Sequence, residues 1–189
     1  MALKSTIFKA ALQVADIERG HYSDYALTIA RHPSETDERM MLRVLAFALH
    51  AAPDLAFGKG LSTDDEPDLW QRDLTGAIAL WIDVGQPDQK LVRRACGRAT
   101  RVVVYAYGRG ADLWWDRSRQ SLERVQNLTV ASVPVATSQE LAGLARRTMQ
   151  LQCTIQDGHV WLGDNERAVE VALTPLRGPA PVAANSRLL

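Results

Sequence analysis

Residues 77–146 alternate between segments typical of strands and segments typical of helices, and this order constrains the fold more than any other feature. Strand-forming runs at 77–83, 102–107 and 128–133 are each followed by a helical pattern. The run at 102–107 shows little alternation of apolar and polar side chains, which is typical of a central parallel strand buried on both faces. Because parallel strands need crossover helices, we predict an α/β fold whose sheet is centred on 77–83 and 102–107.

The composition fits one sizeable domain and excludes several kinds of site. The chain has 189 residues, of which 47% are hydrophobic. Its 22 basic and 22 acidic residues cancel, so contact with nucleic acid would have to come from a local patch rather than from a global basic field. Cys96 and Cys153 stand outside any CxxC or Cys/His cluster, which argues against a zinc site and fits a reducing cytoplasm.

Neither a signal peptide nor a membrane span is expected. The N-terminal segment MALKSTIFKAALQVAD alternates instead of forming an apolar run, and the longest apolar run in the chain has six residues. We therefore expect a cytoplasmic, monomeric protein that contacts no membrane, with a single domain over residues 1–176. The proline- and alanine-rich tail, 177–189, is expected to be disordered.

Both ends of the predicted domain carry hairpin patterns. Apolar and polar residues alternate over 8–14 and over 149–156, which is the period of a strand with one buried face. A turn at 18–20 and a second strand at 25–29 complete the first hairpin, and Asp157-Gly158 is a strong hairpin signal after the other strand. We expect these N- and C-terminal hairpins to form an additional antiparallel β layer.

A helix is predicted over about 35–51, with Ser34 as its N-cap. Glu38 lies on its apolar face, three and four residues before Met41 and Leu42. A carboxylate there would point toward the sheet that the helix covers, where an isolated buried charge is costly and needs a partner or a function. The alternative is that Glu38, one turn into the helix, reaches water and favours the helix dipole.

Two carboxylates, Asp68 and Asp83, bracket a predicted β-hairpin. If its turn has four residues, Arg72 pairs with Ala77. Asp68 then faces Trp81, and Asp83 is its diagonal neighbour on the same sheet face. Two convergent carboxylates repel each other unless they hold a cation or a proton. The alternative is a pair of solvated aspartates at the strand ends.

A helix predicted over about 88–100 carries the one dense basic stripe of the sequence. With one residue just beyond the helix, its members are Lys90, Arg93, Arg94, Arg98 and Arg101. Such a stripe could contact nucleic-acid phosphates, which would position a backbone without reading bases. The alternative is a solvated helix face.

Five segments together carry a family resemblance. They are TIFKAALQVADIERGHY, ARHPSETDERMMLRVLAFA, LSTDDEPDLW, LWIDVGQPD and TMQLQCTIQDGHVWLGD. The chain resembles the YaeQ family of small bacterial proteins over nearly its whole length, to about Leu176. That family is regarded as a divergent branch of the PD-(D/E)XK nuclease superfamily. The resemblance therefore implies a restriction-endonuclease-like mixed sheet flanked by helices, with an α-β-β-β-α-β core.

The resemblance also implies a metal site. The aspartate of the superfamily's Pro-Asp motif would be Asp68, its second acid would be Asp83, and its helix glutamate would be Glu38. These three carboxylates would be the ligands of Mg²⁺, with Mn²⁺ as the alternative ion. The catalytic lysine of the superfamily stands two residues after the second acid, and this chain departs from the pattern with Gly85 there.

A basic residue of the next helix could replace that lysine. Lys90 is the best-placed candidate and would orient the attacking water or stabilise developing charge, while Arg93 and Arg94 are further substitutes. The function implied is a Mg²⁺-dependent phosphodiesterase acting on nucleic acid. The alternative is a non-catalytic nucleic-acid- or protein-binding protein on a degenerate nuclease scaffold. A third interpretation is an interaction module that uses the edge of the C-terminal sheet.

Overall fold

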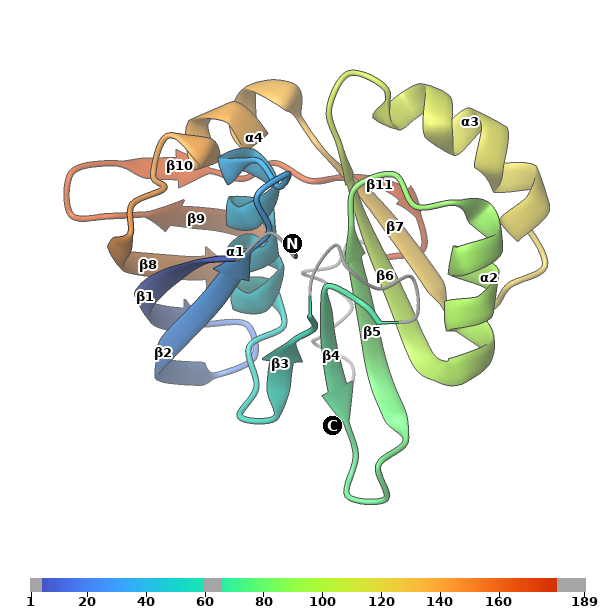
Figure 1. Cartoon of the computed structure of the whole chain (residues 1–189), viewed down its shortest axis with the longest axis horizontal. Helices are drawn as coiled ribbons and strands as arrows, with labels where there is room; N and C mark the ends of the chain where they lie inside the picture. The colour runs from blue at the N-terminus through green and yellow to red at the C-terminus, as the bar shows by residue number, and fades with distance from the viewer. Residues whose placement is uncertain (1–4, 60–65, 180–189) are drawn as a thin grey trace.

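The computed structural model describes residues 5–59 and 66–179, which form two β-sheets and four helices (Figure 1). Sheet A has the strand order β10-β9-β8-β1-β2, and sheet B has the order β11-β7-β6-β5-β4-β3. The strands of sheet A are β1 (Thr6–Asp16), β2 (His21–Arg31), β8 (Thr148–Gln156), β9 (His159–Gly163) and β10 (Ala168–Glu170). Those of sheet B are β3 (Leu55–Phe57), β4 (Leu69–Arg72), β5 (Ile78–Val84), β6 (Ala99–Tyr107), β7 (Leu128–Val133) and β11 (Thr174–Arg177). The helices are α1 (Asp37–Leu49), α2 (Gln89–Arg98), α3 (Ala111–Leu122) and α4 (Val135–Ala142).

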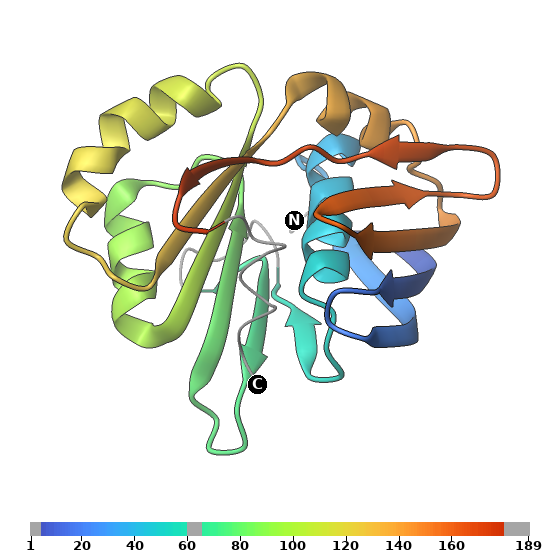
Figure 2. The same ribbon diagram turned by 180° about the vertical axis from the view of Figure 1, so that it is seen from behind.

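Helix α1 lies between the two sheets and is the centre of the main core (Figures 1 and 2). Every residue from Met40 to Leu49 is buried, because the inner face of sheet A covers one side of the helix and sheet B covers another. On the opposite face of sheet B, α2 and α3 enclose a second, smaller core. Within the described ranges, no helix is long and apolar enough to cross a membrane.

The expected centre of the sheet is confirmed. β5 and β6 are adjacent and parallel in the middle of sheet B, and β7 continues the parallel pairing. On the other side, β3, β4 and β5 form an antiparallel meander, so the chain from α1 runs helix, three strands, helix α2 and strand β6. The C-terminal ends of β5 and β6 therefore lie at the same end of sheet B as the N-terminus of α1.

The additional β layer exists, but the prediction that it is antiparallel was wrong. β1 and β2 form the expected hairpin, and Asp157 and Gly158, both with positive φ, form the turn of the β8–β9 hairpin. The two hairpins join through β1 and β8, which run parallel. Hairpin turns determine pairing only between neighbouring strands, so they carry no information on the direction in which two distant hairpins meet.

Three expected boundaries also need correction. The N-cap of α1 is Thr36, whose hydroxyl accepts from the Arg39 N–H at 3.1 Å, whereas Ser34 contacts the His32 ring. The sequence suggests Ser138 as the cap of a helix that runs to about Arg146, but α4 begins at Val135 and Ser138 lies inside it. The tail was expected to be disordered from residue 177, but Arg177 ends β11, which pairs with β7, and residues 180–189 lie outside the described residues.

Candidate active site: two paired aspartates and an arginine network

The β4–β5 hairpin brings Asp68 and Asp83 together at the end of its ladder. Trp70 pairs with Trp81 and Leu69 pairs with Ile82, so Asp68, the next residue along, stands opposite Asp83. The register differs by two residues from the predicted one, because Arg72 pairs with Ile78 instead of Ala77 and a bulge between Gln71 and Arg72 adds a second residue. The two aspartates are therefore direct neighbours rather than diagonal ones.

Asp68 is buried and fully bonded to its surroundings. The side chain of Asp68 is only 6% exposed. The backbone N–H of Val84 donates to Oδ2 at 2.7 Å, and the Arg39 Nη2 donates to both carboxylate oxygens, at 2.7 and 2.9 Å. These bonds hold the carboxylate of Asp68 in one orientation beside the C-terminal end of β5.

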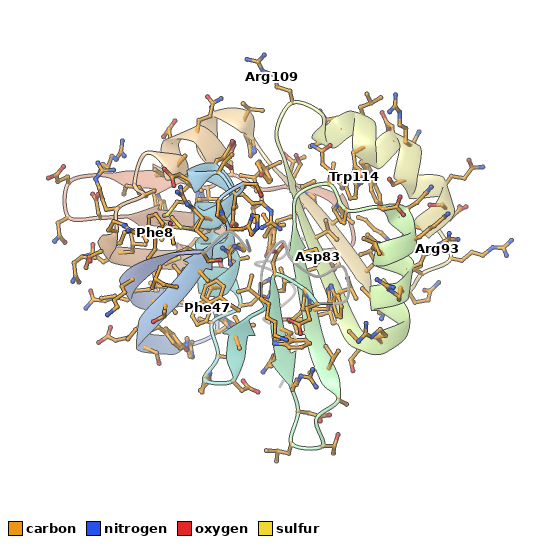
Figure 3. All side chains as sticks on the ribbon, viewed as in Figure 1. Phe8, Phe47, Asp83, Arg93, Arg109 and Trp114 are labelled. Atoms are coloured by element: carbon orange, nitrogen blue, oxygen red, sulfur yellow. The ribbon has the colours of Figure 1, made fainter. Side chains whose placement is uncertain are left out.

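Asp83 is in a less favourable environment for a charge. Figure 3 labels it on β5, and the Trp81 indole N–H donates to its Oδ2 at 2.9 Å. Burial raises the pKa of Asp83 to about 7, and repulsion from the neighbouring Asp68 adds to this rise, while the bond from Trp81 opposes it. The side chain therefore exchanges its proton near neutral pH, and a nearby cation would favour its ionised form.

A network of two arginines and a buried glutamate supports Asp68. Arg39 Nη1 donates to Glu35 Oε1 at 2.9 Å, so its guanidinium joins Glu35 to Asp68. Arg43, which is 1% exposed, donates to both oxygens of Glu35 at 2.8 Å and to the Ala30 carbonyl at 3.0 Å. None of these three residues was among the predicted site residues. The four-residue spacing of Glu35, Arg39 and Arg43 was the signal that could have found them, since residues at this spacing share one helix face.

Glu38 lies apart from the two aspartates. Its Oε1 accepts a hydrogen bond from the Ser138 hydroxyl of α4 at 2.5 Å, so α4 provides its partner. Among residues 5–59 and 66–179, no three His, Cys, Asp or Glu side chains are placed to hold a metal ion together. The expected convergence of Glu38 with Asp68 and Asp83 is therefore not found in the described part, which excludes Asp64 and Asp65 of the acidic loop.

The position of the missing lysine is occupied by a glycine with a backbone that suits glycine alone. Gly85 has φ +120°, and a Cβ atom there would lie 3.9 Å from the Tyr107 ring. Lys90 is exposed on α2, with its backbone N–H bonded to the capping carboxylate of Asp88 at 2.7 Å. Arg93 lies on the outer side of α2, away from Asp83 (Figure 3). Arg39 of α1 is thus a cation in direct contact with Asp68, whereas the sequence predicted that Lys90, or else Arg93 or Arg94, would reach the acids from α2.

The basic helix face is smaller than predicted. Lys90, Arg93, Arg94 and Arg98 are exposed on α2. Arg101 does not belong to it, because α2 ends at Arg98 and Arg101 is part of β6. Its side chain shares a sheet face with Tyr105, near the buried His50 at the end of α1.

The comparisons with known proteins agree with the sequence resemblance. A family model described as "YaeQ protein" matches residues 1–173. The chain is 45% identical to "Uncharacterized protein YaeQ" of Salmonella typhi and 44% identical to that of Escherichia coli strain K12, in both cases over 95% of this chain and 100% of the relative. The crystal structure of YaeQ protein from Xanthomonas axonopodis pv. citri has a TM-score of 0.88 at 45% identity and covers 93% of this chain and 99% of its own. The YaeQ protein from Pseudomonas syringae has a TM-score of 0.89 at 38% identity, over 93% and 97%.

Proposed function

The chain belongs to the YaeQ family, and from its paired aspartates we propose that it is a cytoplasmic, metal-dependent phosphodiesterase acting on nucleic acid, built on a nuclease-type scaffold. One observation carries the proposal: Asp68 and Asp83 are neighbours at the end of the β4–β5 ladder. The order α1-β3-β4-β5-α2-β6 supports it, because the α-β-β-β-α-β core implied by the PD-(D/E)XK resemblance has the same order. Each aspartate would occupy the strand position that the superfamily gives to its acids.

The residues present fit a divalent cation. Two neighbouring carboxylates offer the oxygen ligands that Mg²⁺ and Mn²⁺ prefer, and their mutual repulsion would be relieved by a positive charge between them. When bound, such a cation lowers the pKa of a coordinated water and neutralises charge on a phosphate. Asp68 and Asp83 would hold it, and the two hydrogen bonds from Arg39 would orient Asp68 for that purpose.

The first test is cleavage of a labelled single-stranded or duplex oligonucleotide with Mg²⁺ or Mn²⁺. We expect Asp83→Asn and Asp68→Asn each to lower the rate about 100-fold or more, which is the scale of removing one group that stabilises transition-state charge. EDTA should abolish cleavage. Asp116→Asn, which removes an exposed carboxylate of α3, is the matched control and should cleave like the wild type. Cleavage that persists in both site variants would contradict the proposal.

The second test separates the two cationic candidates. Because Arg39 contacts Asp68, we expect Arg39→Lys to lower the cleavage rate about tenfold, since lysine cannot reproduce the bonds of a guanidinium. Lys90 is exposed, so Lys90→Ala should only weaken nucleic-acid binding and flatten its salt dependence by about one phosphate contact. If Lys90→Ala abolishes cleavage in a folded protein, Lys90 holds the catalytic role that the sequence predicted for it.

A second candidate function rests on the contacts of the acids. Asp68 already has a cationic partner in Arg39, and Glu38 is bonded to Ser138 instead of the other carboxylates. Both features suit a scaffold that binds nucleic acid without cutting it. Oligonucleotide binding with no cleavage under Mg²⁺ or Mn²⁺, and no rise in melting temperature with either ion, would establish this alternative.

A further inference from the structure

The β4–β5 hairpin and the C-terminal end of α2 place two tryptophans and two arginines on the face of sheet B that bears Asp83. Trp70 and Trp81 pair directly across the two strands. The guanidinium carbon of Arg72 lies 4.1 Å from the centroid of the Trp70 ring, and that of Arg98 lies 5.5 Å from the centroid of Trp81. We call these four residues the Trp–Arg strip.

The outer half of the Trp–Arg strip is open to solvent. Trp81 is buried beneath α2, but Trp70 is half-buried and Arg72 is exposed. Two features cause this difference. α2 packs mainly over β6, which lies two strands away from β4, and the neighbour of Trp70 on β3 is the small Ala56.

The hairpin also projects from the body of the molecule (Figures 1 and 2). Its turn residues are all exposed, and Leu74 at the tip is fully so. The one carboxylate of the turn, Asp73, is engaged by the backbone N–H groups of Thr75 and Ala77. A projecting, accessible hairpin that carries Arg72, with Arg98 of α2 beside it, presents a surface for a flexible anionic chain.

The inner end of the Trp–Arg strip reaches the candidate active site. The Trp81 indole N–H donates to Asp83 Oδ2 at 2.9 Å, so the strip runs from the exposed hairpin to the paired aspartates. The exposed basic residues of α2 flank the same face and surround it with positive charge. A chain bound at the accessible Trp70 and Arg72 would therefore bring a phosphodiester group toward Asp68, two residues from Trp70, and its neighbour Asp83.

We infer that the Trp–Arg strip binds single-stranded nucleic acid and leads it to Asp68 and Asp83. The delivery of the strand to the aspartates rests on the proposed function, whereas the binding does not depend on it. Unpaired bases stack on aromatic rings and guanidinium planes, and a duplex hides these base faces. Trp70 and Arg72 receive a base, and Arg72 and Arg98 contact the adjoining phosphates. The substrate class of the site is accordingly single-stranded rather than duplex nucleic acid.

The experiment measures binding without cleavage. Fluorescence anisotropy follows a fluorescein-labelled 20-nucleotide oligothymidylate in EDTA over a series of salt concentrations. We expect Trp70→Ala to weaken binding about 5- to 100-fold, the range for loss of one stacking aromatic, and Trp70→Phe to retain most of it. Arg72→Ala should weaken binding and reduce the salt slope by about one. Arg146→Ala, which removes an exposed arginine between α4 and β8, is the matched control and should bind like the wild type.

Three results would overturn the inference. They are wild-type affinity in a folded Trp70→Ala protein, an equal loss in Trp70→Phe and Trp70→Ala, and equal affinity for a 20-base-pair duplex at the same salt. The second would mean that Trp70 only stabilises the hairpin. Because EDTA prevents metal-dependent cleavage, strand binding without any nuclease activity would refute the proposed function alone. Cleavage of duplex that is unaffected by Trp70→Ala would refute only the proposed binding role of the Trp–Arg strip.

Discussion

Replacing Arg43 with alanine is expected to lower the free energy of unfolding by about 3–5 kcal/mol, the scale of removing one partner from a buried ion pair. Arg43 and Glu35 are both buried, and two hydrogen bonds of 2.8 Å join them. Without Arg43, the carboxylate of Glu35 stays in the core with Arg39 as its remaining partner, and the carbonyl of Ala30 on β2 loses a donor. Urea unfolding followed by circular dichroism measures the loss.

Two further variants test the cause of that loss. Arg146→Ala removes an exposed arginine and should change the free energy of unfolding by no more than about 0.5 kcal/mol. The double variant Glu35→Leu with Arg43→Met removes both buried charges and should regain most of the stability that Arg43→Ala loses. A loss below about 1 kcal/mol in Arg43→Ala would mean that the pair contributes no more than a surface ion pair.

Asp83→Asn should make the protein more stable above neutral pH, although the same change removes a proposed metal ligand. The pKa of Asp83 is raised from 3.8 to about 7, which corresponds to about 4 kcal/mol between its two protonation states as an upper limit. Below pH 4 the carboxyl group of Asp83 is protonated in both the folded and the unfolded chain, so it does not lower the free energy of unfolding. Between pH 4 and about 7 the unfolded chain releases this proton while the folded chain keeps it, so the free energy of unfolding falls as the pH rises.

The measurement compares the two proteins by urea unfolding at pH 4 and pH 8 without divalent metal. The stability gained by Asp83→Asn should be near zero at pH 4 and about 1–4 kcal/mol at pH 8. The Trp81 indole N–H keeps an acceptor, because asparagine retains a carbonyl oxygen. Parallel stability curves for the two proteins from pH 4 to pH 8 would show that the folded protein does not shift the pKa of Asp83.

The nearness of the two aspartates was predictable from the hairpin, even though the register was not. The sequence predicts Arg72 opposite Ala77, but Arg72 pairs with Ile78, and the bulge between Gln71 and Arg72 shifts the register by one more residue. Because the two shifts add to one strand period, Asp68 and Asp83 stay neighbours at the end of the ladder.

The partner of Glu38 could not be predicted in the same way. Helical phase identifies the apolar face of a helix, but α1 is covered on several sides and all residues from Met40 to Leu49 are buried. The phase therefore does not tell which neighbouring layer a side chain on α1 reaches. Ser138, the residue that Glu38 contacts, comes 100 residues later, and nothing near it in the sequence marks it as a partner.

The parallel pairing of β1 with β8 has a consequence for synthesis of the chain. β1, the first strand to leave the ribosome, pairs with β2 early but can pair with β8 only after about 140 more residues have been made. The contact between Arg147 and Ile7 marks this separation. At translation rates of about 5–20 residues per second, that wait is about 7–28 s. Until then, the apolar side of the β1–β2 hairpin and of α1 lacks part of its cover. The main core can therefore close only after β8 has emerged.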